Sequence, residues 1–158
     1  MTIERKDQLD VSVSAAVYIM DEEGRLLLLK QAAPEKGGKW GPPGGGIKAH
    51  EDPIDVAKRE TREEIGVEVE LIDLIHIKTA DRGDAASGLG FIFRGKILSG
   101  EVWFKDREIA ECKYFTPDET RTLLESNMLY KPEYNLDGIE DWLKGESYPL
   151  GVIKRMNH

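Results

Sequence analysis

The chain has 158 residues, of which 40% are hydrophobic and 33% charged, a composition typical of one folded domain, which we expect to span residues 1–158. Its net charge of −8 argues against a nucleic-acid polymer as partner, because phosphate backbones favour a basic surface. No apolar run approaches the roughly 20 residues of a membrane helix, the first residues are polar, and Cys112 is the single cysteine, so we expect a cytoplasmic protein.

A hairpin and a loop are predicted before residue 48. Residues 11–20 and 25–30 are apolar and flank a turn-forming segment at residues 21–24, which predicts a β-hairpin. Residues 31–47 are rich in glycine and proline, and this composition predicts a loop.

A helix is predicted to follow that loop. Asp52 is a capping residue followed by Pro53, which suits the first helical position. Gly66 suits the left-handed position after a helix end, so the helix should end at about Ile65. One face carries a core-facing apolar stripe with helical spacing: Ile54, Ala57, Thr61 and Ile65.

The second half of the chain is predicted to contain three strands and a flexible loop. β-Branched and alternating apolar residues predict strands at residues 67–78, 91–98 and 112–115. Residues 79–90 lie between the first two strands and are predicted to form the loop.

Two further helices are predicted near the end of the chain. Thr116 and Glu119 have the spacing of a capping box, with a proline between them, which predicts a helix over residues 116–126. The last helix is predicted at residues 136–144, before Gly145. These elements predict an α/β (α+β) fold with helices on both faces of a mixed sheet.

The predicted helix after residue 52 carries a cluster of acidic side chains. Glu60, Glu63 and Glu64 are spaced i, i+3 and i+4, so their carboxylates lie on one side and repel each other. A cation would relieve this repulsion, and oxygen-only ligands favour hard ions such as Mg²⁺ or Mn²⁺. Arg59 is placed to pair with a carboxylate, for which Glu51 is the candidate.

A solvated helix face is the alternative explanation for residues 59–64 taken alone. The longer spacing pattern favours a functional site. Residues 45–67 read GGIKAHEDPIDVAKRETREEIGV, and this segment resembles the signature of the Nudix hydrolase family, G-x5-E-x7-R-E-U-x-E-E-x-G-U, where U is a bulky aliphatic residue. Eight of its nine specified positions match, and the departure is Thr61, where we expect slightly weaker packing and intact chemistry.

The resemblance extends upstream to the family pattern W-x-x-P-G-G, which is matched by Trp40, Pro43, Gly44 and Gly45. It implies a Nudix-type α/β/α sandwich. It also implies hydrolysis of a phosphoanhydride bond, by water that a Mg²⁺ or Mn²⁺ ion activates. The implied substrate is a small nucleotide in which a nucleoside diphosphate is linked to another group, a nucleoside triphosphate or a dinucleoside polyphosphate being our candidates.

The resemblance also assigns roles to individual residues. The metal ligands and catalytic carboxylates implied are Glu60, Glu63 and Glu64, joined by the Gly44 carbonyl. A further carboxylate is expected before a late strand, and Glu108 is our choice, with Glu111 as the reserve. The structural positions of the signature are Gly45, Glu51, Arg59 and Gly66.

Substrate contacts and assembly are less constrained by the resemblance. Lys39, Trp40 and Arg94 are our candidates for substrate binding, although packing beneath the glycine loop explains Trp40 equally well. A homodimer is possible, because homodimers are common in the family. The alternative to an enzyme is a non-catalytic Nudix-like module that senses a nucleotide, but such modules typically lose acids of the signature, and here all are present.

Overall fold

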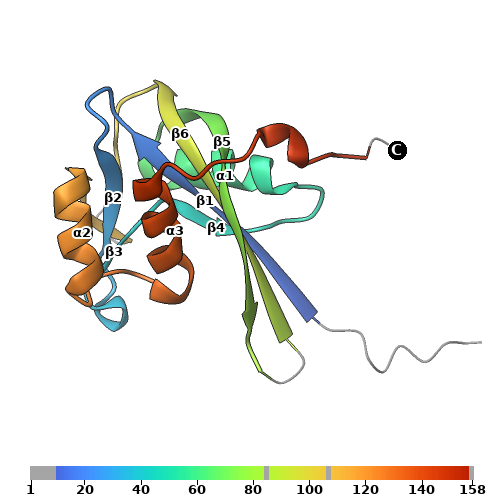
Figure 1. Ribbon diagram of the computed structural model, residues 1–158, viewed down its shortest axis with the longest axis horizontal. Helices are drawn as coiled ribbons and strands as arrows, with labels where there is room; N and C mark the ends of the chain where they lie inside the picture. The colour runs from blue at the N-terminus through green and yellow to red at the C-terminus, as the bar shows by residue number, and fades with distance from the viewer. Residues whose placement is uncertain (1–9, 84–85, 106–107, 157–158) are drawn as a thin grey trace, which may run out of the picture.

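A seven-stranded mixed sheet forms the centre of the protein, shown in Figure 1 as a computed structural model that describes residues 10–83, 86–105 and 108–156. Five strands follow the order β3-β2-β1-β6-β5, while β4 pairs with β1 and β7 pairs with β2. The pair β1–β6 is parallel and the other pairs are antiparallel. The strands are β1 (Asp10–Met20), β2 (Leu26–Gln31), β3 (Trp40–Gly41), β4 (Gly44–Gly46), β5 (Glu68–Asp81), β6 (Ala86–Ser99) and β7 (Ile109–Phe115).

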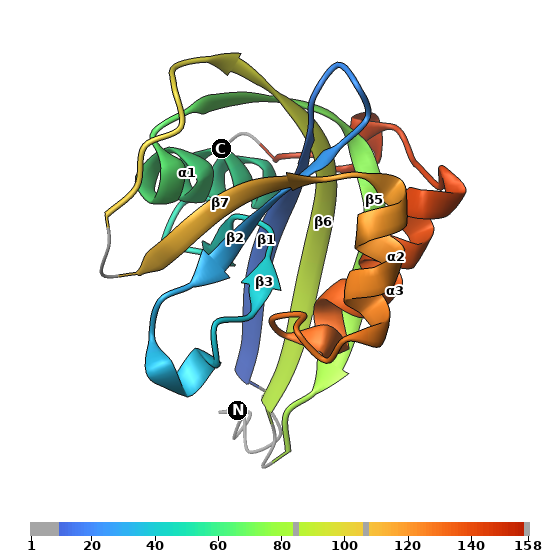
Figure 2. The same cartoon turned by 90° about the vertical axis from the view of Figure 1, so that its left-hand side faces the viewer.

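Helices cover both faces of this sheet, which confirms the predicted fold class. Figure 2 shows α1 (Pro53–Ile65) on one side and the pair α2 (Pro117–Glu125) and α3 (Pro132–Lys144) on the other. Short 3-10 turns, η1 (Pro34–Lys36) and η2 (Leu150–Val152), complete the described elements. No helix in the described part of the chain is long and apolar enough to span a membrane.

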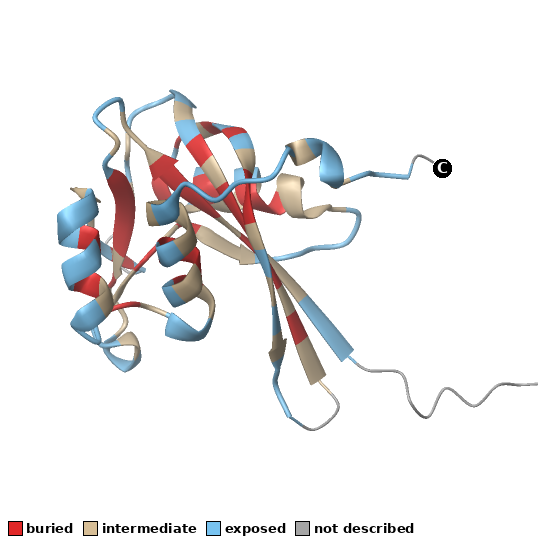
Figure 3. Ribbon diagram, in the orientation of Figure 1, coloured by how far each residue is buried: buried red, intermediate tan, exposed pale blue. Residues whose placement is uncertain are grey.

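Alternate side chains of the central strands pack against the two helical layers. In β1, Val17 and Ile19 join the cluster that contains Val56 of α1, while Tyr18 between them joins the cluster that contains Ile139 of α3. This follows from the period of two in a strand. The buried segments of the strands accordingly lie between the helices (Figure 3).

The bounds of α1 are those that the sequence predicts. The Asp52 carboxylate accepts a hydrogen bond from Asp55 N, and the Asp55 carboxylate accepts one from Asp52 N. Gly66 has a left-handed backbone with φ of 73° and donates its N–H to Arg62 O. These reciprocal caps satisfy end groups that a helix leaves without intrahelical partners.

The apolar stripe of α1 differs from the prediction at two positions. Ile54 is only partly buried, whereas Val56, which the stripe omits, is fully buried. Thr61 is also fully buried, and its hydroxyl donates a hydrogen bond to Ala57 O at 2.8 Å. The polar atom of the one non-matching signature residue is therefore satisfied within the helix.

Two predicted loops contain strands. Residues 31–47 include β3 and β4, and residues 79–90 include the end of β5 and the start of β6. The predictions were wrong because glycine and polar residues here pair across the sheet: Gly88 lies opposite both Ala80 of β5 and Ser12 of β1. These strand ends project beyond the helices (Figure 1).

Two other elements begin earlier than predicted. The strand β7 begins at Ile109, because pairing with β2 continues to Gln31 beyond a register shift. The helix α3 begins at Pro132, which occupies the first turn as prolines commonly do. Its N-cap residue, Lys131, has a left-handed backbone with φ of 45°.

Candidate functional site

The glycine strand β4 brings the main chain next to the acidic side of α1. Gly44 and Gly45 pair with Ala16 and Ala15 of β1. A Cβ atom at Gly44 would collide with the Ala15 carbonyl, and one at Gly45 would collide with the carboxyl group of Glu60. Because glycine has no Cβ, the Glu60 carboxyl group can approach the backbone of β4 closely.

Arg59 ties the loop before α1 to the helix. Its guanidinium pairs with the Glu51 carboxylate through Nε and through Nη2, the latter at 3.0 Å, and Nη2 also donates to Gly46 O at 2.9 Å. Its Nη1 donates to Glu60 Oε1 at 2.8 Å and Glu63 Oε2 at 3.2 Å. The hydrogen bonds from Arg59 lower the pKa of Glu51 to about 2, so this carboxylate is held in its charged form.

Glu64 lies in a contrasting environment. Its Oε1 accepts a hydrogen bond from Gly44 N at 3.0 Å. Burial is the largest cause that raises the pKa of Glu64 to about 8, and the charges of Glu60 and Glu108 raise it further. The Gly44 N–H and the Lys36 ammonium only partly oppose this rise. The last turn of α1 therefore holds a carboxyl group whose negative charge is poorly compensated by the protein itself.

The other predicted carboxylates lie at different distances from this centre. Glu63 is half exposed and directs its carboxylate to Arg59 and, at 3.9 Å, to Lys48. Glu108 is close enough to Glu64 to raise its pKa. Glu111 lies within β7 opposite Lys30 and raises the pKa of its neighbour Cys112. The segment between Lys105 and Glu108 lies outside the described residues.

The donor set suits a divalent ion, although the carboxylates do not form a closed cage. Among the described residues, no three acidic, histidine or cysteine side chains converge as a ready metal site. The candidate donors are oxygens, the preferred ligands of Mg²⁺ and Mn²⁺. The charges of the neighbouring acids also disfavour the charged form of Glu64, and a bound cation would offset this repulsion.

None of the three residues predicted to bind substrate lines the pocket beside β4. Trp40 packs edge to face against Phe115, with ring centres 5.0 Å apart, in the cluster beneath α2 and α3. Arg94 pairs with Asp73 of β5. Lys39 lies in the turn after η1, where its N–H donates to Lys36 O.

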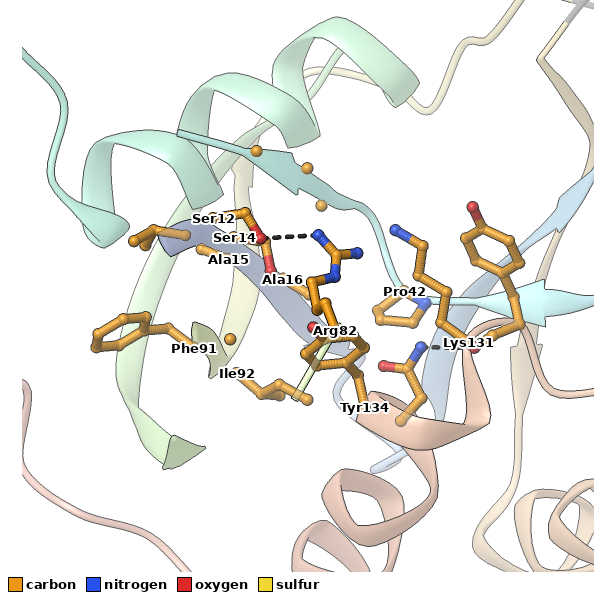
Figure 4. A pocket seen from close by; sticks show the side chains of 17 residues that line it. Ser12, Ser14, Ala15, Ala16, Pro42, Arg82, Phe91, Ile92, Lys131 and Tyr134 are labelled. Atoms are coloured by element: carbon orange, nitrogen blue, oxygen red, sulfur yellow. Dashed lines mark hydrogen bonds between the residues drawn. The ribbon is translucent and has the colours of Figure 1, made fainter. Parts of the chain in front are cut away.

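This pocket has a volume of about 210 Å³ and lies between β4, β1, β6 and the start of α3. Figure 4 shows Arg82 reaching across it to Ser12, whose hydroxyl accepts a hydrogen bond from Nη1 at 2.8 Å. Its other polar and aromatic lining residues are Ser14, Phe91, Tyr130, Lys131, Tyr134 and Asn135. The sequence-based prediction missed this lining, because α3 and the strands are far apart in the chain.

One sequence signal could have indicated the pocket. Gly88 and Gly90 alternate in β6 and so share one face of the sheet. A Cβ atom at Gly88 would collide with the Tyr134 hydroxyl, and one at Gly90 would lie 3.0 Å from Tyr134 Cδ1. Two glycines with this spacing in a strand indicate the close approach of another group.

Comparisons with known proteins identify the family of this chain. The family model for the NUDIX domain matches residues 11–134. A MutT-like protein of Streptomyces ambofaciens is 37% identical over 109 residues, which are 68% of this chain and 66% of that protein.

Solved structures are similar as well. A NUDIX hydrolase from Nitrosomonas europaea has a TM-score of 0.75 and 25% identity, covering 93% of this chain and 98% of its own. The MutT NUDIX hydrolase from Burkholderia pseudomallei has a TM-score of 0.60 and 27% identity, covering 69% and 85% of the two chains. The matched family region contains β4, α1 and Glu108.

Proposed function

The chain belongs to the Nudix family of pyrophosphohydrolases, and we propose that it hydrolyses a phosphoanhydride bond in a nucleoside triphosphate or a dinucleoside polyphosphate. The observation that carries this proposal is the poorly compensated Glu64 carboxyl group, which is held on Gly44 N beside Glu60. An isolated carboxyl group in such a place is costly. A cation bound there would compensate its negative charge and would also attract an anionic substrate.

The proposed metal ligands are Glu60, Glu63, Glu64 and the Gly44 carbonyl, with Glu108 as a further carboxylate. When bound there, a Mg²⁺ or Mn²⁺ ion would polarise the phosphate oxygens and lower the pKa of water. Glu63 is half exposed, so its side chain has the freedom to turn toward such an ion.

The proposed role of Glu108 is that of general base. Its carboxylate takes the proton of the attacking water, the water oxygen bonds to one phosphorus, and the bridging oxygen leaves with the departing phosphate. Arg59 stays paired with Glu51 during this step and keeps the loop and helix in register. The proximity of Glu108 to Glu64 supports this assignment over Glu111.

We also propose that residues 1–158 form one Nudix domain that acts in the cytoplasm and can form a homodimer. The contribution of α3 to the core supports the first point, because Ile139 lies beyond the matched family region and is fully buried. Light scattering of the purified protein tests the homodimer.

A product-resolved screen tests the activity. Purified protein is incubated with nucleoside triphosphates, dinucleoside polyphosphates and nucleoside diphosphate sugars, each with Mg²⁺ or Mn²⁺, and the products are identified. We expect release of a nucleotide by cleavage within the phosphate chain. Tight nucleotide binding without turnover of any compound would instead support the non-catalytic, nucleotide-sensing alternative.

A further inference from the structure

Two lysines share one tyrosine ring at the edge of the pocket. The ammonium groups of Lys36, in η1, and Lys131, before α3, each lie 5.5 Å from the centre of the Tyr130 ring. No carboxylate among the described residues lies within salt-bridge distance of either one. In a chain of net charge −8, two ammonium groups therefore lie beside one aromatic ring without a salt bridge to a described carboxylate.

The main chain holds this group in a defined position. The connection between α2 and α3 is hydrogen-bonded to β3, since Trp40 N donates to Met128 O at 2.8 Å and Tyr130 N donates to Trp40 O at 2.6 Å. Gly41 leaves room for the tyrosine, because a Cβ atom there would lie 3.1 Å from Tyr130 Cβ. Tyr130, whose ring both ammonium groups approach, is thus fixed against β3.

Lys131 lies at the start of α3, at the edge of the pocket. It is the N-cap of the 13-residue α3 and has φ of 45°. Because Pro132 has no N–H and the N–H groups of Tyr134 and Asn135 donate to Lys131 O, the positive charge placed here is that of the Lys131 ammonium group. Lys131 lines the pocket together with Gly44 and Gly45, and Figure 4 shows its side chain beside Pro42. The positive group therefore borders the glycines that contact Glu60 and Glu64.

Lys36 lies on the side of this group nearer the acidic centre. Its ammonium is 3.4 Å from Gln31 Oε1 and interacts electrostatically with Glu64. Positive charge therefore begins near the proposed cleavage site and continues around Tyr130 to the pocket. A nucleotide with only two phosphates would place both at the carboxylate centre and leave this charge unused.

We propose that Lys36 and Lys131 form a clamp that binds phosphates beyond the cleaved diphosphate, so that the enzyme prefers substrates with three or more consecutive phosphates. This inference rests on the proposed function and adds to it the residues that bind the further phosphates. The shared chemistry is a polyphosphate chain, whether it ends in a free phosphate or in a second nucleoside. Lysine suits this role because a flexible point charge can follow a chain of phosphates.

The test compares substrates that differ in phosphate number. We would measure kcat/KM for ATP, diadenosine tetraphosphate and ADP-ribose in the wild type, Lys36→Gln, Lys131→Asn and Lys131→Arg. Asparagine tolerates the left-handed backbone of residue 131 and carries no charge. The matched control is Lys144→Gln, which removes the same charge from the exposed last turn of α3.

We expect Lys36→Gln and Lys131→Asn each to lower kcat/KM for the polyphosphates by about 10-fold relative to ADP-ribose, the size of one charge-assisted contact. Lys131→Arg and Lys144→Gln should retain the wild-type ratio. The wild-type rates for ATP and for diadenosine tetraphosphate tell which end of the chain is preferred. An equal loss on all substrates, or no loss on any in variants with wild-type thermal stability, overturns the clamp.

Calorimetry separates failure of the clamp from failure of the proposed function. Inorganic tripolyphosphate should bind the wild type more tightly than pyrophosphate, and both neutral variants should lose this advantage. A wild type that hydrolyses ADP-ribose but neither polyphosphate would refute the clamp and the proposed substrates, while hydrolysis of a phosphoanhydride bond would stand. If no nucleotide is hydrolysed, the proposed function fails, and tripolyphosphate binding still decides for or against the clamp.

Discussion

Two glutamates, one before the start of α1 and one in its last turn, have pKa values that are shifted in opposite directions. Before α1, the pKa of Glu51 is lowered to about 2 because Arg59 binds its carboxylate. In the last turn of α1, the pKa of Glu64 is raised to about 8, chiefly by burial and then by the neighbouring acids. The first carboxylate is held in its charged form by an arginine of the chain, whereas burial favours the neutral form of the second.

The rest of the helix start follows the same pattern. Arg155, near the C-terminal end, donates to the Asp55 carboxylate and to His50 O, both at 2.7 Å. It also lies 3.7 Å from the Asp52 carboxylate. The acids at the start of α1 therefore have partners within the chain. This contrast supports the proposal that the last turn of α1, rather than its start, binds a ligand.

The largest effect is expected from Glu64→Gln. The substitution keeps the hydrogen bond from Gly44 N but removes the negative charge of a proposed metal ligand, so kcat should fall by about 10³-fold or more. Steady-state kinetics of the folded variant measure this. Glu125→Gln, an exposed change in α2, is the control. A Glu64→Gln enzyme with near wild-type turnover would break the contrast between the two ends of α1.

Removal of divalent ions should also abolish activity. Because the candidate donors near Glu64 are oxygens, excess chelator should reduce turnover to background and added Mg²⁺ or Mn²⁺ should restore it. Assays after dialysis against chelator measure both steps. Full turnover in chelator, with no metal found by elemental analysis, would contradict this prediction.

Glu108→Gln and Glu111→Gln should differ in their effects. Glu108 interacts with Glu64 and is the proposed base, so its substitution should reduce kcat by about 10²-fold, as expected for one acid–base group. Glu111 lies within β7, and its substitution should have little effect. Saturating substrate and metal are used for both. If the two results are exchanged, Glu111 is the base; if neither variant is impaired, the base lies within the signature.

The smallest effects are expected on the stability of the fold, whose pH dependence should have opposite slopes above and below about pH 4.5. In chelator, stability should fall as pH rises from about 4.5 to about 8, because folded Glu64 holds its proton more tightly than the unfolded chain. Stability should fall also as pH decreases from about 4.5 to about 2, since folded Glu51 must then be protonated.

Thermal unfolding measured across this pH range tests both slopes. Glu64→Gln should flatten the upper slope and Glu51→Gln the lower one, each by roughly 3 °C or more. Mg²⁺ should also flatten the upper slope in the wild type, since binding to the folded state stabilises it. An upper slope that neither Glu64→Gln nor Mg²⁺ alters would show that another group causes it.

The features that the sequence alone determined are local ones. The caps at Asp52 and Gly66 define α1 to the residue, and the apolar segments around the turn after Met20 define the first hairpin. The spacing of the signature identifies the family and the pairing of Glu51 with Arg59. Each of these signals depends on neighbours within one or two turns of chain, or on a short fixed spacing.

Only the tertiary structure decided which residues surround the acidic centre. The opposite pKa shifts of Glu51 and Glu64 cannot be inferred from residue type, because they depend on burial and on charges from other elements. The proposed clamp joins Lys36 and Lys131, which reach the same ring of Tyr130 where the connection before α3 is hydrogen-bonded to β3. Periodicity and capping report on backbone geometry over a few residues, whereas electrostatic and packing environments arise from segments that folding brings together.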